Sequence, residues 1–155
     1  MLASTSLSVI STGSFPSLVG VMARHEYSLM NAVRILIADD TAQVRSDLRT
    51  ILPLAGEMNE LSIEIAGEAG DGNDAIRLTG ELHPDVVLMD LTMPDLDGYS
   101  ATRKIKTLYP DTKVLVLTVH STQEARQKAY QAGADGFIEK GAPITELIQK
   151  IQSFG

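Results

Sequence analysis

The sequence contains no cysteine and no tryptophan, and aromatic residues make up only 5% of its 155 positions. Without thiols, disulfide scaffolds, thiolate zinc sites and cysteine nucleophiles are excluded. The three histidines are scattered along the chain, which leaves few ligands for a histidine metal site. Basic residues are also scarce, since 13 Lys and Arg stand against 20 Asp and Glu and the net charge is −7. Because a surface of this sign repels phosphodiester backbones, we expect no direct nucleic-acid binding by this chain.

Long apolar runs are missing as well. No stretch reaches the roughly 18 apolar residues of a transmembrane helix, so we expect no membrane contact and a cytoplasmic location. Residues 1–30 carry only two charges, Arg24 and Glu26, and hold seven serines. They lack the basic start and unbroken apolar stretch of a secretory signal, while their low acidity leaves an organelle transit peptide open. We interpret residues 1–30 as a disordered extension or a mis-assigned start, and residues 31–155 as the folded domain.

From residue 31 onward, apolar strand-like runs alternate with amphipathic helical segments. The expected strands are 33–38, 61–65, 86–89, 114–117 and 136–139. The expected helices are one capped by Thr41 and stopped by Pro53 and Gly56, one over 71–82, one through 101–108, one over 123–132 and one opened by Pro143. Such alternation predicts an α/β fold in which helices cover both faces of a parallel sheet.

The strand composition also predicts the strand order. The runs at 33–38, 86–89 and 114–117 are apolar apart from Arg34, which is typical of central strands. The second strand alternates apolar and polar residues and the fifth is short, so both suit the sheet edges. The order 2-1-3-4-5 satisfies these preferences and is that of the three-layer, flavodoxin-like (βα)5 fold.

Polar side chains follow four of the five predicted strands. Asp39 and Asp40 end the first strand, Asp90 the third, Thr118 the fourth and Lys140 the fifth. Because the carboxyl ends of parallel strands share one edge of the sheet, these side chains can converge on one pocket. Three crowded carboxylates favour a hard cation with oxygen ligands, and Mg²⁺ meets that requirement. This arrangement suits the transfer of a phosphoryl group to the carboxylate of Asp90, with the metal, the Lys140 ammonium and the Thr118 hydroxyl beside it.

The same residues carry a specific resemblance. The segments ILIADD, VVLMDLTMPDLDG, VLVLT and GADGFIEK, in this order, resemble the receiver domains of two-component response regulators from Val33 to about Gln152. The resemblance implies that Asp90 accepts the phosphoryl group, and that Asp40 binds Mg²⁺ directly while Asp39 does so mainly through water. It further implies the following roles: the Thr92 backbone carbonyl as another metal ligand, Thr118 and Lys140 as phosphoryl-binding groups, Thr118 and Phe137 as switch residues, and Thr92 and His120 as residues that tune dephosphorylation.

Three positions depart from the commonest receiver pattern. Lys140 is followed by Gly141, where many receivers have proline after a cis bond; a cis bond at a non-proline residue would cost about 3 kcal/mol or more. Val119 stands where a smaller residue is usual and narrows access to Asp90. Phe137 lacks the hydroxyl of a tyrosine, and burial in the core explains this residue at least as well as a switch role.

The resemblance implies a phosphoryl-accepting signalling switch rather than an enzyme, apart from self-catalysed phosphotransfer and autodephosphorylation. Its donor would be a sensor histidine kinase or a phosphotransfer protein. Its output surface would be the fourth helix, fifth strand and fifth helix, and phosphorylation would shift the fourth helix. The stretch GADGFIEKGAPITELIQ is similar to NarL-type receivers, which usually precede a helix-turn-helix domain. We therefore expect either a stand-alone receiver acting on an output protein or the receiver part of a transcriptional regulator, and a homodimer is an open alternative.

Other interpretations stay open at this point. A degenerate receiver would act by protein interaction without phosphorylation, although all five active-site positions are filled. An aspartate-nucleophile phosphatase requires a second aspartate two residues after the nucleophile, and Thr41 and Thr92 occupy those positions after Asp39 and Asp90. A flavodoxin would need a Ser- and Thr-rich phosphate loop after the first strand, which the sequence lacks.

Overall fold

The computed structural model describes Gly20 and residues 31–155, and the interpretation of residues 1–30 otherwise lies outside the described residues. From Val33 to Gly155 the chain forms one α/β unit. Its elements are, in order, β1 (Val33–Ala38), α3 (Ala42–Met58), β2 (Ile63–Ala69), α4 (Gly72–Leu82), β3 (Val86–Met89), α5 (Gly98–Leu108), β4 (Lys113–Thr118), α6 (Gln123–Gln131), β5 (Gly136–Glu139) and α7 (Ile144–Ser153). Among the described residues, no helix has the length and hydropathy to cross a bilayer.

The five strands form one parallel sheet in the order β2-β1-β3-β4-β5. This confirms the α/β class, the flavodoxin-like topology and the predicted strand order. The residues of β3 are buried throughout, and those of β1 and β4 become so after their first positions, as expected for strands covered on both faces. The alternating strand β2 and the short strand β5 lie at the edges.

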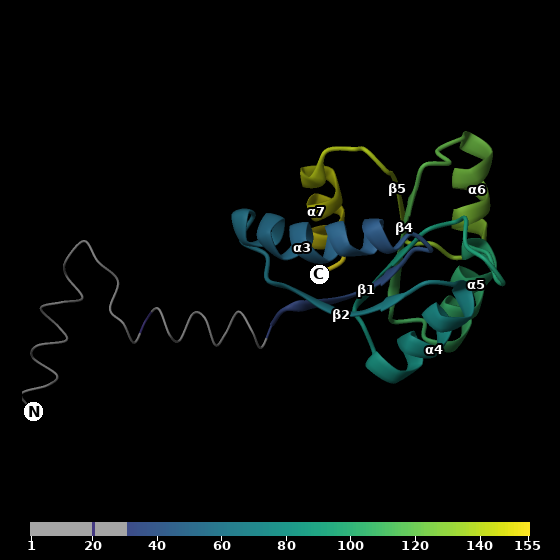
Figure 1. Cartoon of the computed structure of the whole chain (residues 1–155), viewed down its shortest axis with the longest axis horizontal. Helices are drawn as coiled ribbons and strands as arrows, with labels where there is room; N and C mark the ends of the chain where they lie inside the picture. The colour runs from purple at the N-terminus through teal and green to yellow at the C-terminus, as the bar shows by residue number, and fades with distance from the viewer. Residues whose placement is uncertain (1–19, 21–30) are drawn as a thin grey trace, which may run out of the picture. The chain divides into compact units, whose positions relative to one another are not determined.

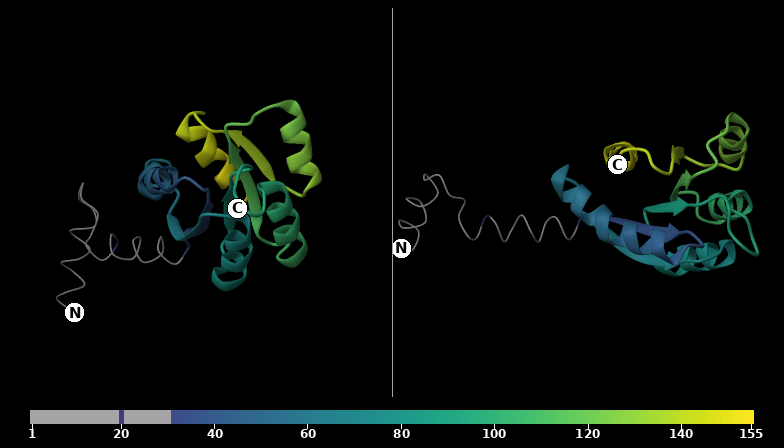
Figure 2. Two further views of the ribbon diagram at one scale, coloured as in Figure 1. Left: turned by 45° about the vertical axis from the view of Figure 1, so that its right-hand side comes forward. Right: turned by 45° about the horizontal axis from the view of Figure 1, so that its top comes forward.

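Helices cover the sheet in two layers, with α3 and α7 on one face and α4, α5 and α6 on the other (Figures 1 and 2). Successive residues of β1 divide between the layers because side chains alternate along a strand. Ile35 and Ile37 pack in the cluster that includes Leu52 of α3 and Ile148 of α7. Leu36 and Ala38 pack in the cluster of α4 and α5. Both faces of the sheet are therefore covered by apolar side chains, and the polar groups of the predicted site lie at the carboxyl ends of the strands.

The first helix is longer than the sequence predicts. It continues through Pro53 and ends at Met58, so the prediction that Pro53 and Gly56 stop it is wrong. Pro53 has no N–H for the carbonyl of Arg49, but Arg49 is exposed and its carbonyl can be hydrated. Leu52 and Ala55 are buried on either side of Pro53, and this burial favours continuing the helix.

Aspartate side chains hold the starts of α5 and α3 in two different ways. The side chain of Asp97 caps α5 by accepting a hydrogen bond from the Ser100 amide at 2.9 Å. Thr41 occupies the N-cap position of α3 but makes no capping hydrogen bond. Instead its amide donates to Asp39 Oδ1 at 2.9 Å. The turn before α3 is thus held by a carboxylate of the sheet edge.

Candidate functional site

Two buried aspartates lie side by side at the carboxyl ends of β1 and β3. Ala38 is opposite Met89 in the parallel register, so Asp39 and Asp90 leave the sheet at the same level. The Asp90 amide donates to the Ala38 carbonyl at 2.9 Å, which extends the pairing to the site. The exposed fractions are 2% for Asp39 and 6% for Asp90, whereas the next residue, Asp40, is exposed. The fold therefore buries two carboxylates and leaves a third open to solvent.

The three carboxylates form a single cluster. Asp39, Asp40 and Asp90 each offer one oxygen atom, and these atoms lie within 4.8 Å of one another. The cluster supplies hard oxygen donors, which are the ligands of Mg²⁺. Two of the three are buried, and one ammonium group is the only cation paired with them in the part of the chain that the structure describes. The donor set and its excess negative charge fit a divalent cation.

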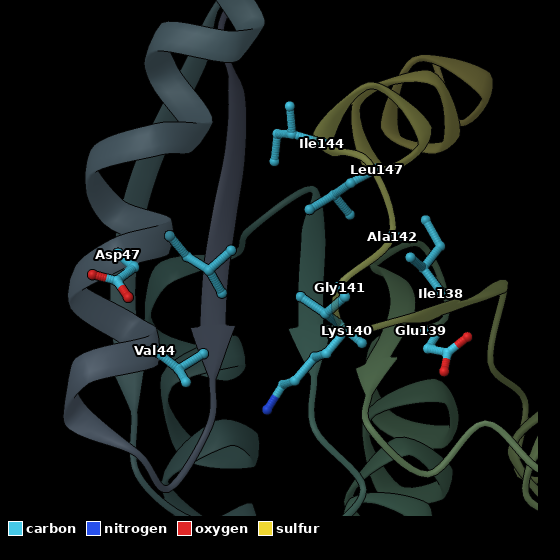
Figure 3. Close-up of a pocket in the computed structure, with 11 residues that line it drawn as sticks. Val44, Asp47, Ile138, Glu139, Lys140, Gly141, Ala142, Ile144 and Leu147 are labelled. Atoms are coloured by element: carbon cyan, nitrogen blue, oxygen red, sulfur yellow. The ribbon is translucent and has the colours of Figure 1, made fainter.

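Lys140 reaches this cluster from the end of β5. Its backbone amide donates to the Thr118 carbonyl at 2.8 Å, which fixes the residue beside β4. Its ammonium lies 2.5 Å from Asp39 Oδ2 and 3.2 Å from Asp90 Oδ2. Figure 3 shows the Lys140 side chain extending between the ends of two strands. The lysine thus bridges both buried carboxylates, as the convergence of strand ends predicts.

Burial sets the electrostatics of this arrangement. Removal from water raises the pKa of Asp90 above its ordinary value, with Lys140 opposing the shift and Asp39 adding to it. Burial lowers the pKa of Lys140, but its hydrogen bond to Asp39 and the charges of Asp90 and Asp39 outweigh that effect and raise the pKa overall. The lysine is thus held in its charged form, whereas burial and the charge of Asp39 disfavour the ionised form of Asp90.

The remaining polar residues surround the cluster at different depths. Thr118 is fully buried, and its hydroxyl accepts a hydrogen bond from the His120 amide at 3.2 Å. The Thr92 amide lies 3.4 Å from Asp90 Oδ1. The side chains of Thr92 and His120 are exposed at the rim of the site. The hydroxyl of Thr118 is therefore already engaged with the loop that leads into α6.

Phe137 lies away from the carboxylates, in the layer between the sheet and α6. Its ring is 5% exposed and packs in a cluster with Val116 and Ala129. The guanidinium of Arg126 lies over the ring, with Cζ 4.7 Å from its centroid. The ring therefore occupies an inward, buried position beneath α6.

The loop after Lys140 uses glycine in place of the usual proline. There are no cis peptide bonds in the described part of the chain, and Gly141 has φ +95°. A Cβ at this position would meet no atom within 4 Å, so the requirement is for the backbone conformation and not for space. A left-handed glycine thus turns the chain where many receivers have a cis proline.

Sequence reasoning missed two contacts that support the site. Arg45 donates to the Asp39 carbonyl at 2.7 Å and pairs with Glu68 of β2 at 3.4 Å. These two contacts restrain the turn that carries Asp39 and Asp40. Gly98 lies so close to the Asp90 carbonyl that a Cβ would stand 2.1 Å from it. An arginine six residues after Asp39, on the first turns of a helix, is a signal that could have suggested the first contact.

An apolar cleft of about 250 Å³ adjoins the site between α3 and the start of α7. Val44 and Asp47 line it from α3, and Ala142, Ile144 and Leu147 line it from the opposite side (Figure 3). Lys140 and Gly141 also line this cleft. The cleft therefore opens next to the ammonium that bridges the carboxylates.

Comparison with known proteins assigns this chain to a family. Residues 35–152 match the response regulator receiver domain. The chain belongs to this family. It is 38% identical to the response regulator GacA of Pseudomonas aeruginosa over 121 residues, and 39% identical to the response regulator UvrY of Escherichia coli over 121 residues. These alignments cover 77% and 78% of the chain but 54% and 53% of the relatives, so this receiver domain spans about half their length.

Solved structures agree with this assignment. A LuxR-family two-component response regulator from Aurantimonas superposes with a TM-score of 0.72 at 33% identity, covering 79% of this chain and 84% of that one. The signal receiver domain of the putative response regulator NarL from Mycobacterium tuberculosis gives 0.71 at 31% identity, covering 79% and 94%. The resemblance to NarL-type receivers in the sequence is thus confirmed. As a receiver domain of a two-component system, the chain is a signalling protein.

Proposed function

We propose that this receiver domain accepts a phosphoryl group on Asp90 in a Mg²⁺-dependent reaction. The observation that carries the proposal is the ammonium of Lys140, which lies within 3.2 Å of both buried carboxylates in a cluster of three aspartates. A carboxylate beside a metal-binding cluster and a cation has the charge distribution that phosphoryl transfer requires. The donor is a phosphohistidine on a sensor kinase or a phosphotransfer protein, or a small acyl phosphate.

In the proposed reaction an Asp90 carboxylate oxygen attacks phosphorus. A P–O bond forms, the P–N bond of the phosphohistidine breaks, and the imidazole leaves with the electron pair. Asp39, Asp40, Asp90 and the Thr92 carbonyl would hold Mg²⁺, which neutralises charge on the phosphoryl oxygens when bound. Lys140 moves from its contact with the carboxylates to pair with one phosphoryl oxygen, because a lysine acts as a movable point charge.

Thr118 provides the link to the rest of the domain. Its hydroxyl accepts a hydrogen bond from the His120 amide and keeps its own proton to donate to a phosphoryl oxygen. A movement of Thr118 toward that oxygen would pull on the His120 amide and so displace the loop of Val119 and His120, which α6 follows directly. We propose the surface of α6, β5 and α7 as the output face, read by an output protein or by a helix-turn-helix domain elsewhere in a longer regulator. His120 and Thr92 stand at the rim, where they tune water access to the acyl phosphate.

Labelling with acetyl phosphate tests the proposal. We expect the intact protein to gain the mass of one phosphoryl group in the presence of Mg²⁺, and Asp90→Asn to abolish that gain. Asp97→Asn is the matched control, because Asp97 is a cap in the same loop and does not belong to the cluster.

Chelation of Mg²⁺ should stop the labelling of the unaltered chain, and renewed Mg²⁺ should restore it. Stoichiometric labelling of Asp90→Asn, or labelling that is insensitive to chelation, would contradict the proposal. A chain that is never labelled would instead favour a receiver that acts by protein interaction alone.

A further inference from the structure

The helix α6 is weakly anchored by its own side chains. Its buried residues are two alanines, Ala125 and Ala129, which contribute little apolar area. The large ring of Phe137 in β5 fills the space beneath the helix and is the largest buried member of that cluster. The position of α6 therefore depends on how firmly the helix is held to this ring.

Arg126 makes a cation–π contact between α6 and that ring. It lies between the two buried alanines of the helix, and its guanidinium stacks over Phe137 with Cζ 4.7 Å from the ring centroid. Within residues 31–155, no carboxylate forms an ion pair with Arg126 and no side-chain hydrogen bond involves its guanidinium. The cation is thus directed at the π face, where a guanidinium is attracted to the ring quadrupole.

A second tie holds the loop before α6. The Thr118 hydroxyl accepts a hydrogen bond from the His120 amide, two residues before the N-cap Thr122. The two ties differ in how they respond to phosphorylation. A phosphoryl group on Asp90 would accept from the Thr118 hydroxyl and draw that side chain toward itself, but it would make no direct contact with Arg126. The stack on Phe137 therefore remains to oppose any displacement of α6.

We propose that Arg126 is a positioning residue that holds α6 in place through its stack on Phe137 and so sets how easily this receiver switches. The inference rests on the proposed function only in its last part, the link to phosphorylation. A contact present in one state and lost in the other biases the equilibrium by its own free energy. Removing the guanidinium should therefore populate the displaced helix more and favour whatever stabilises that state.

Amide hydrogen exchange on residues 123–131, in the absence of any phosphodonor, tests the first part. Arg126→Met keeps an unbranched apolar stem and removes the cation, and we expect exchange about two- to fivefold faster, as for loss of an exposed cation–π contact. Arg126→Lys should restore part of the protection. The matched control is Lys128→Met, which removes an exposed cation of the same helix that pairs with Glu124 at 3.2 Å and contacts no ring.

A double-mutant cycle identifies the ring as the partner. In a Phe137→Leu background, Arg126→Met should no longer change the exchange of α6, because the stack is already lost. The inference is overturned if Arg126→Met exchanges like the unaltered chain, if Lys128→Met has an equal effect, or if the effect persists without the ring.

The link to the switch is tested with beryllofluoride and Mg²⁺, which mimic the acyl phosphate. Arg126→Met should bind beryllofluoride about two- to fivefold more tightly than the unaltered chain. Without the stack on Phe137, less free energy is needed to displace α6 when beryllofluoride binds. Unchanged affinity with faster exchange would overturn this link. If the unaltered chain does not respond to beryllofluoride at all, the proposed function fails, whereas the exchange results without a phosphodonor stand independently.

Discussion

Asp90 carries the main electrostatic conflict among the single residues of this domain. Its carboxylate is buried beside that of Asp39, and one ammonium group, that of Lys140, is shared between the two. Burial and the Asp39 charge favour the protonated form of Asp90, so the pKa is raised in the folded state. The buried Asp90 carboxylate is therefore held in its charged form at a cost to the stability of the folded domain.

This conflict predicts that Asp90→Asn stabilises the metal-free domain at neutral pH, on the order of 1 kcal/mol. Because the folded pKa of Asp90 lies above the unfolded value near 3.8, the penalty is complete above the folded pKa and vanishes as the pH falls below the unfolded one. The advantage of Asp90→Asn should shrink in urea unfolding curves measured from pH 7 toward pH 4 in chelator.

Asp97→Asn provides the comparison for that experiment, because asparagine caps a helix as well as aspartate does. Its stability should match that of the unaltered chain at every pH. An Asp90→Asn variant that is less stable at pH 7, or whose advantage grows on acidification, would show that Asp90 is not strained.

At the scale of elements, α3 contains the clearest departure from local sequence rules. Pro53 lies inside the helix, where it removes one backbone hydrogen bond. Pro53→Ala restores that N–H for the carbonyl of Arg49, and we expect a gain of about 1–2 kcal/mol after allowing for the more flexible unfolded chain. Urea unfolding measures this gain. A destabilised Pro53→Ala would mean that the ring of Pro53 contributes packing that outweighs the missing hydrogen bond.

The elements also show how far sequence reasoning reaches in this fold. Strand order followed from composition, because β1, β3 and β4 are apolar on both faces apart from the charged residues near the starts of β1 and β4, and such strands suit central positions. The end of α3 did not follow, because local breakers predicted a stop at Pro53 while burial of Ala55, a tertiary effect, extends the helix.

The same division applies to the site. Asp39, Asp90 and Lys140 could be brought together from the sequence, because every parallel strand ends at the same edge. The Arg126 stack on Phe137 could not, because it depends on the rotamer of a long side chain across two elements. The spacing of Arg45 from Asp39 offered a signal for their contact, but the rotamer that forms it is likewise set by the fold. The glycine turn at Gly141 was also beyond reach, since nothing local fixes its φ of +95°.

At the scale of the whole molecule, a cation bound by the acidic cluster would stabilise the entire domain. Its carboxylates come from the ends of β1 and β3, which are far apart in sequence and meet only in the folded state. A cation that binds this arrangement and not the unfolded chain stabilises all residues together by mass action. Lys140 competes with the cation, because its ammonium occupies both buried carboxylates.

We therefore expect Mg²⁺ to raise the melting temperature, with a gain of about 2.7 kcal/mol when its concentration is a hundred times the dissociation constant. Lys140→Met should be less stable than the unaltered chain without Mg²⁺ and should gain more stability from Mg²⁺, because the two buried carboxylates lose the ammonium that is shared between them. Asp40→Asn should gain the least stability from Mg²⁺, since it removes the exposed ligand and leaves the buried pair of Asp39 and Asp90 intact.

Thermal unfolding in MgCl₂, compared with NaCl of equal ionic strength, separates binding of the cation from screening of charge. An equal response in both salts, or in Asp40→Asn and the unaltered chain, would mean that the cluster binds no divalent cation.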